Sequence, residues 1–232
     1  MGVSTKTATE VVNYCNKNIV PDAGFIRDNK GKHPITWFQK YFDFVDDIKL
    51  RNHLADAYYQ ARFVYKLMVA LNLTSFKKKA VVKFQTIQYA SIYEALIDYV
   101  LDKFHRDSDE LKKVATVEEY KKVTAFSKST KVAFTENGIT SDIHSCKLTS
   151  KSLKLKEVRF SKRVEAAVAL KIIKQDTADK INWFYELRNN VHLTTAAINK
   201  FYPSVNQSIE AFEQMDSFIK QMKKHINEIK AA

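Results

Sequence analysis

The stretch QYASIYEALIDYVLDKF, residues 88–104, carries the clearest structural pattern in the chain. Its apolar residues recur at intervals of three and four, which places them along one face of an α-helix: Ile92, Ala95, Leu96, Tyr99 and Val100. No glycine or proline interrupts residues 78–104. Because a helix with one continuous apolar face must bury it, we expect this segment to form the core of a helical protein.

Helical patterns continue on both sides of this segment. Glycine and proline number 4 and 3 in 232 residues, and most of them fall in the loop at 21–34, so the rest of the chain lacks the turns that many strands would need. We expect an all-α fold, with a short helix at 5–19, one long or two stacked helices at 36–72, and further helices at 163–173, 177–193 and 206–230.

The helical pattern lapses between residues 106 and 160. This segment is rich in Lys, Ser and Thr, has a turn sequence at ENG (136–138), and alternates apolar and polar residues in LKLKEVRF (153–160). The alternation favours a short strand or hairpin, but a basic flexible loop explains the same residues equally well. We therefore expect a single helical domain over 1–232, with an insertion at 106–160.

Composition narrows the class of protein. Hydrophobic residues make up 45% of the chain, enough to form a sizeable core. Cys15 and Cys146 match no metal-ligand spacing, as is typical of a reducing compartment. The N-terminus has no apolar signal core, and no segment approaches the roughly 20 apolar residues that cross a bilayer. We expect a cytoplasmic protein with no membrane association, bound metal or cofactor.

The formal net charge of +12 predicts an anionic partner. Half of this charge falls in residues 143–163, where seven basic residues face Glu157 alone. We expect them to hold the phosphate backbone of RNA, together with Lys77, Lys78 and Lys79; a solvated lysine-rich loop is the alternative. The seven are Lys147, Lys151, Lys154, Lys156, Arg159, Lys162 and Arg163.

The sequence RNNVH, residues 188–192, is the best candidate for a site of chemistry. On a continuous helix, Arg188 and His192 share one edge beside the apolar stripe of Ile181, Phe184 and Val191. Arginine binds phosphate oxygens through its planar fork, and histidine transfers protons near neutral pH. Asn189 would orient the imidazole or the substrate. Both cations also suit a helix C-terminus, so a purely structural role is the alternative.

The stretch VEAAVALKIIKQDTADKINWFYELRNNVHL resembles the C-terminal half of HEPN domains, and residues 88–104 resemble the earlier long helix of such bundles. In that family a helix ends in Arg, followed by Asn, Asp or His, and then by a His. The resemblance covers 78–104 and 160–230 and carries over Arg188, Asn189 and His192. Three residues separate Arg188 from His192, where the family motif has four to six.

This resemblance implies a metal-independent endoribonuclease that cuts RNA through the ribose 2′-hydroxyl. HEPN ribonucleases are often homodimers whose active cleft lies between two copies, and many act in prokaryotic or phage-related defence and toxin systems with an antitoxin or other partner protein. The alternative implied by the same family is a non-catalytic HEPN-like module for protein interaction or nucleotide binding.

Overall fold

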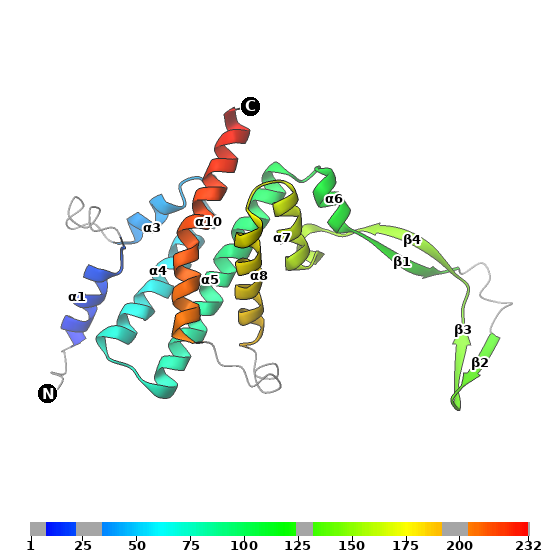
Figure 1. The fold of residues 1–232 in the computed structure, drawn as a ribbon, viewed down its shortest axis with the longest axis horizontal. Helices are drawn as coiled ribbons and strands as arrows, with labels where there is room; N and C mark the ends of the chain where they lie inside the picture. The colour runs from blue at the N-terminus through cyan, green and yellow to red at the C-terminus, as the bar shows by residue number, and fades with distance from the viewer. Residues whose placement is uncertain (1–7, 22–33, 124–131, 192–203, 232) are drawn as a thin grey trace.

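The computed structural model describes residues 8–21, 34–123, 132–191 and 204–231. These residues form a mainly helical protein: a bundle of long helices from which a narrow β-structured arm extends (Figure 1). The bundle contains α1 (Ala8–Asn18), α3 (Ile35–Tyr41), α4 (Ile48–Ala70), α5 (Ser75–Phe104), α7 (Phe160–Ala169), α8 (Gln175–Asn189) and α10 (Val205–Ala231).

Helix α5 is the centre of the bundle and packs against α4, α7, α8 and α10. The predicted apolar face is confirmed, because Ile92, Leu96 and Val100 are fully buried. Tyr93 joins three helices: its ring stacks on Phe184 of α8 at 5.7 Å, and its hydroxyl donates a hydrogen bond of 2.6 Å to the carbonyl of Ala211 in α10. Through these two contacts Tyr93 holds both α8 and α10 against α5.

The segment predicted as one long or two stacked helices forms two, α3 and α4. Asp47 caps α4 by accepting hydrogen bonds from the backbone N–H groups of Lys49 and Leu50, at 2.9 and 3.1 Å. At its other end Asn72 adopts a left-handed backbone with φ of 49°, which lets the chain turn sharply into α5. Aromatic contacts, such as Phe38 with Tyr58 at 5.2 Å, hold α3 on α4.

The segment between α5 and α7 begins with α6 (Asp109–Ala115), which still packs against α7 and buries Leu111 in the core. The chain then leaves the bundle and forms the arm, as β1 (Thr116–Lys122), β2 (Val132–Glu136), β3 (Ile139–Ile143) and β4 (Cys146–Ser152). Strands β1 and β4 pair antiparallel as one ribbon, and β2 and β3 pair as a second hairpin. The sequence left open whether this segment forms a strand or hairpin or a basic flexible loop, and its described part forms hairpins.

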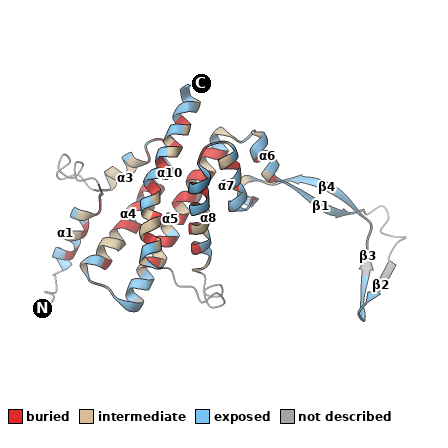
Figure 2. Cartoon of the chain, viewed as in Figure 1, coloured by how far each residue is buried: buried red, intermediate tan, exposed pale blue. Residues whose placement is uncertain are grey.

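The strand positions differ from those predicted. LKLKEVRF forms no strand: it contains the 3-10 turn η2 (Leu155–Glu157) and the start of α7. The turn at ENG is confirmed, because Asn137 and Gly138 have positive φ angles of 49° and 79° between β2 and β3. Residues of β1 and β4 are exposed on both faces of the ribbon (Figure 2), so these strands lack the apolar–polar alternation of a half-buried strand.

Across the described residues, we find no helix of the length and apolarity that a bilayer-spanning segment requires.

Candidate functional site

Arg188 and Asn189 occupy the last turn of α8, and the helix ends there. Asn190 is its C-cap, donating its N–H to the carbonyl of Glu186 at 2.9 Å, and the N–H of Val191 bonds to Arg188 at 3.1 Å. His192 lies outside the described residues. The shared helical edge predicted for Arg188 and His192 requires the helix to continue through residue 192, and α8 ends three residues earlier.

Among the described residues Arg188 makes one ion pair, and part of its guanidinium stays accessible. Its Nη1 donates a hydrogen bond of 2.8 Å to Oε2 of Glu94 on α5, and its guanidinium lies over the ring of Tyr185 at 5.2 Å. The side chain is 32% exposed. Because a guanidinium carries five N–H donors, this pair leaves donors for a second anion, and we find no other described residue that binds them.

A row of carboxylates on α5 organises this region. Glu94, Asp98 and Asp102 are four residues apart and so lie along one side of the helix. Glu94 binds Arg188 of α8 and also Nη2 of Arg163 of α7 at 2.9 Å, while Arg163 contacts Asp98 through Nη1. Asp102 pairs with Arg106, at 2.9 Å. We call these three carboxylates and three arginines the arginine ladder.

Arg163 is the buried member of the arginine ladder. It is only 5% exposed, unlike the other six basic residues predicted to bind RNA, which are exposed. Burial acts to lower its pKa, but Asp98 and Glu94 outweigh that effect and raise it, so the guanidinium stays charged. Burial likewise raises the pKa of Asp98 against the opposing attraction of Arg163. Arg163 therefore links α7 to α5 inside the bundle, and its buried side chain is not accessible to a polyanion.

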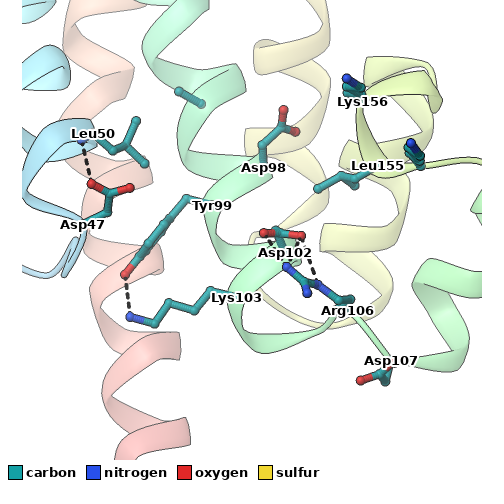
Figure 3. A pocket seen from close by; sticks show the side chains of 12 residues that line it. Asp47, Leu50, Asp98, Tyr99, Asp102, Lys103, Arg106, Asp107, Leu155 and Lys156 are labelled. Atoms are coloured by element: carbon teal, nitrogen blue, oxygen red, sulfur yellow. Dashed lines mark hydrogen bonds and ion pairs between the residues drawn. The ribbon is translucent and has the colours of Figure 1, made fainter.

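A groove of about 1000 Å³ lies beside the arginine ladder, between the start of α4, the second half of α5 and η2 (Figure 3). Its apolar lining comes from Leu50, Ala95 and Leu155. Lys154 and Lys156, two of the predicted RNA-binding residues, line the η2 side and form no ion pair with any described residue. The α5 side is acidic, so the groove as a whole is a mixed-charge surface and not a simple anion site.

The remaining predicted RNA-binding residues divide between the arm and the start of α7. Lys147 and Lys151 are exposed on β4, and Arg159 is exposed just before α7. Lys162 pairs with Glu165 at 2.6 Å, on the surface of α7. Lys77, Lys78 and Lys79 are exposed in the first turns of α5.

Two ring contacts bring the end of this basic stretch close to the RNN motif. Phe160, the first residue of α7, stacks on Tyr185 at 4.3 Å, and Tyr185 in turn lies under Arg188. The start of α7 therefore packs beside the last turns of α8. Arg159 and Arg188 are 29 positions apart in the sequence, but they lie at the start of α7 and the end of α8, which pack together here.

The ribbon of β1 and β4 adds basic residues that the sequence did not single out. Opposite residues of an antiparallel pair share a face, so Lys121 with Lys147, and Val117 with Lys151, place three lysines on one face. The acidic residue of that face is Glu119, which pairs with Lys121 at 3.0 Å. Lys122 points to the other face. The sequence TVEEYKK reads as mixed charge, and only strand pairing shows which residues share a face.

The stripe predicted to support a homodimer is used within one chain. Ile181 is fully buried, and Phe184 is 1% exposed in its contact with Tyr93. A second copy could not pack on these two side chains, so any twofold contact near Arg188 must use exposed neighbours such as Asn189.

Two histidines that carry no signal in the sequence meet in the structure. His105, the C-cap of α5, and His225 on α10 approach through their Nε2 atoms at 2.8 Å. Burial lowers the pKa of His105, and the charge of His225 lowers it further, while Glu110 acts to raise it. Burial also lowers the pKa of His225, while Glu228 acts to raise it. Their separation in sequence, 120 residues, hides the pair from any local motif.

Within the described part of the chain, no three His, Cys, Asp or Glu side chains converge as metal ligands would. No family model, no curated protein and no solved structure matches this chain.

Proposed function

We propose that this protein binds RNA through the lysine face of the β1–β4 ribbon. The observation that carries the proposal is the exposure of Lys121, Lys147 and Lys151 on one face of a projecting arm, with Glu119 as the acid beside them. Phosphate contacts from lysine supply most of the affinity in nucleic-acid binding, and an arm gives them access to a large polyanion. Lys154, Lys156 and Arg159 extend this basic surface toward α8.

The binding test replaces Lys121, Lys147 and Lys151 together with Gln. Each lost phosphate contact on single-stranded RNA lowers the slope of log K against log salt by about 0.7, so we expect the slope to fall by about 2. The matched control replaces Lys180, Lys220 and Lys224, which are exposed on α8 and α10 and change the net charge equally. Equal weakening by both triple variants would mean that net charge, and not the ribbon, attracts the RNA.

The second step of the proposal is cleavage at the end of α8, as in the HEPN-like endoribonucleases that the sequence resembles. Arg188 supports this step, because it is about one-third exposed and retains guanidinium donors for a phosphate after binding Glu94. Asn189 is exposed beside it. In this proposal Arg188 stabilises the charge of the phosphate, His192 transfers a proton, and Asn189 orients the reacting groups.

The chemistry defines the products and suggests a role for a second copy. The ribose 2′-oxygen attacks phosphorus and loses its proton to a base, while the 5′-oxygen of the next nucleotide leaves and takes a proton from an acid. The products are a 2′,3′-cyclic phosphate and a 5′-hydroxyl. One imidazole cannot serve as base and acid in the same step, so a homodimer would place two copies of His192 at one phosphate. We place this activity in the cytoplasm, in a defence or toxin setting with an antitoxin or similar partner.

The cleavage test incubates purified protein with mixed RNA in excess chelator. We expect fragments with 2′,3′-cyclic phosphate ends, and no cleavage of an oligonucleotide whose 2′-hydroxyls are all replaced by hydrogen. Activity that disappears in chelator and returns with Mg²⁺ would contradict the mechanism. Tight RNA binding with no cleavage would instead support the non-catalytic alternative, a HEPN-like interaction or nucleotide-binding module.

A further inference from the structure

The face of the β1–β4 ribbon opposite to Lys121 and Lys147 carries an exposed apolar pair. Tyr120 and Leu148 lie directly across from each other in the register and are 76% and 52% exposed. Side chains of a cross-strand pair touch or nearly touch, so together they form one small apolar platform. A tyrosine left this open by the described chain is available to a partner, because its ring could bury a large apolar area on contact.

The surroundings of this platform indicate what would cover it. Lys122 lies two residues beyond Tyr120 on the same face and Glu118 two residues before it, so this face has no net charge of its own. The excess positive charge comes from Lys121 and Lys147, the sequence neighbours of the pair on the other face. The two strands are only about 5 Å apart, so long lysine side chains extend past the edges of so narrow a ribbon. The partner must therefore combine planar apolar groups with negative charge, which is the chemistry of an unpaired nucleic-acid strand.

Charge argues against the simplest alternative, a second copy of the ribbon. Strands β1 and β4 carry Lys121, Lys122, Lys147 and Lys151 against Glu118 and Glu119, a net charge of +2. Stacking two ribbons through Tyr120 would bring these like charges together in each copy, which opposes association.

We propose that Tyr120 and Leu148 form a stacking platform for unpaired bases, so that the RNA bound by this protein is single-stranded or looped and not a continuous duplex. This inference rests on the proposed RNA binding and specifies its substrate class. In a duplex the flat faces of the bases are covered by their neighbours, whereas an unpaired base can lie on an aromatic ring. The lysines hold either form through phosphates, and the platform distinguishes between them.

The test measures binding of Tyr120→Ala to two labelled RNAs, an unstructured oligoadenylate of about 16 nucleotides and a blunt duplex of the same length. We expect the affinity for the single strand to fall on the order of 10-fold, since stacking of a base on an aromatic ring contributes that much or more, and the affinity for the duplex to stay unchanged. Tyr120→Phe keeps the ring and should bind both RNAs as the original chain does. The side chain is exposed, so none of these changes threatens the fold.

Three outcomes would overturn the inference. Unchanged binding of the single strand by Tyr120→Ala would mean that no base stacks there, and an equal loss for both RNAs would remove the preference for unpaired bases. A dimer of the original chain that becomes monomeric in Tyr120→Ala, with RNA binding unaltered, would identify the platform as a contact between copies. The Lys121, Lys147 and Lys151 variant separates these failures from a failure of RNA binding itself, because it should weaken both RNAs.

Discussion

The arginine ladder and the β1–β4 ribbon use positive charge in opposite ways. In the ladder, Arg163 and Arg188 bind carboxylates of α5 and hold α7 and α8 against it. On the ribbon, Lys147 and Lys151 have no ion pair with any described residue and stand in solvent. The planar fork of arginine suits buried pairs, and the strongly hydrated ammonium of lysine suits an exposed surface. The net charge of the chain therefore overstates how many positive side chains a partner can bind.

Removing the central arginine should produce the largest effect on stability. Arg163→Ala would leave Asp98 and Glu94 without their shared cation, and breaking a buried ion pair from one side costs about 3–5 kcal/mol of unfolding free energy. The measurement is urea unfolding. Arg159→Ala is the matched control, because its side chain is exposed and unpaired among the described residues, and it should change stability by less than about 0.5 kcal/mol. Similar small changes in both variants would show that the ladder does not hold the bundle together.

Arg188→Ala should have a smaller effect on stability and a large one on activity. Its pair with Glu94 is about one-third exposed, so solvent weakens it and the expected loss is on the order of 1 kcal/mol. If Arg188 binds the reacting phosphate, RNA cleavage should fall at least 100-fold, as for loss of a donor that stabilises developing charge.

A charge-conserving control separates the two roles of this residue. Arg188→Lys keeps a cation for Glu94 but loses the planar fork, so it should recover most of the stability and little of the cleavage. Full cleavage by Arg188→Ala would assign Arg188 to the ladder alone.

The smallest effect concerns pH and lies outside both regions, at His105 and His225. The pKa of each is lowered in the folded chain, mainly by burial, so the unfolded chain binds more protons below its ordinary pKa near 6.5. Stability is therefore greatest above that pH, and it decreases as the pH falls from there through the lowered pKa values of the two histidines in the folded chain. Melting temperature should drop between pH 7.5 and 5.5, and a His105→Gln, His225→Gln double variant should show a shallower drop. An equal slope in both proteins would contradict the role of the pair.

The sequence predicted the helical core because the buried residues of a helix recur with the helical period. Ile92, Leu96 and Val100 follow the helix repeat, and the structure confirms that they are buried. The ribbon has no comparable pattern in its sequence. Both of its faces are exposed to solvent, so apolar residues such as Tyr120 do not alternate with polar ones.

The candidate site was predictable only in part. RNN is a local motif, but α8 ends at Asn189, before the end predicted for this helix. The partner of Arg188, Glu94, lies 94 residues away, and no local pattern could link the two. One clue was available: Glu94, Asp98 and Asp102 recur every four residues along the core helix α5, and a row of acids on a core helix predicts basic partners on the helices that pack against it.

The most direct test of this division of charge is RNA binding by a chain without its ribbon, measured across a range of salt concentrations. Thr116 and Ser152 face each other in the register, so a short Gly-Ser linker can replace residues 117–151 without separating α6 from η2. We predict that the slope of log K against log salt falls by about 3, at about 0.7 for each of the four lysines of β1 and β4, while the unfolding free energy of the bundle stays the same. Unchanged affinity and an unchanged slope would contradict the account and place the RNA on the bundle.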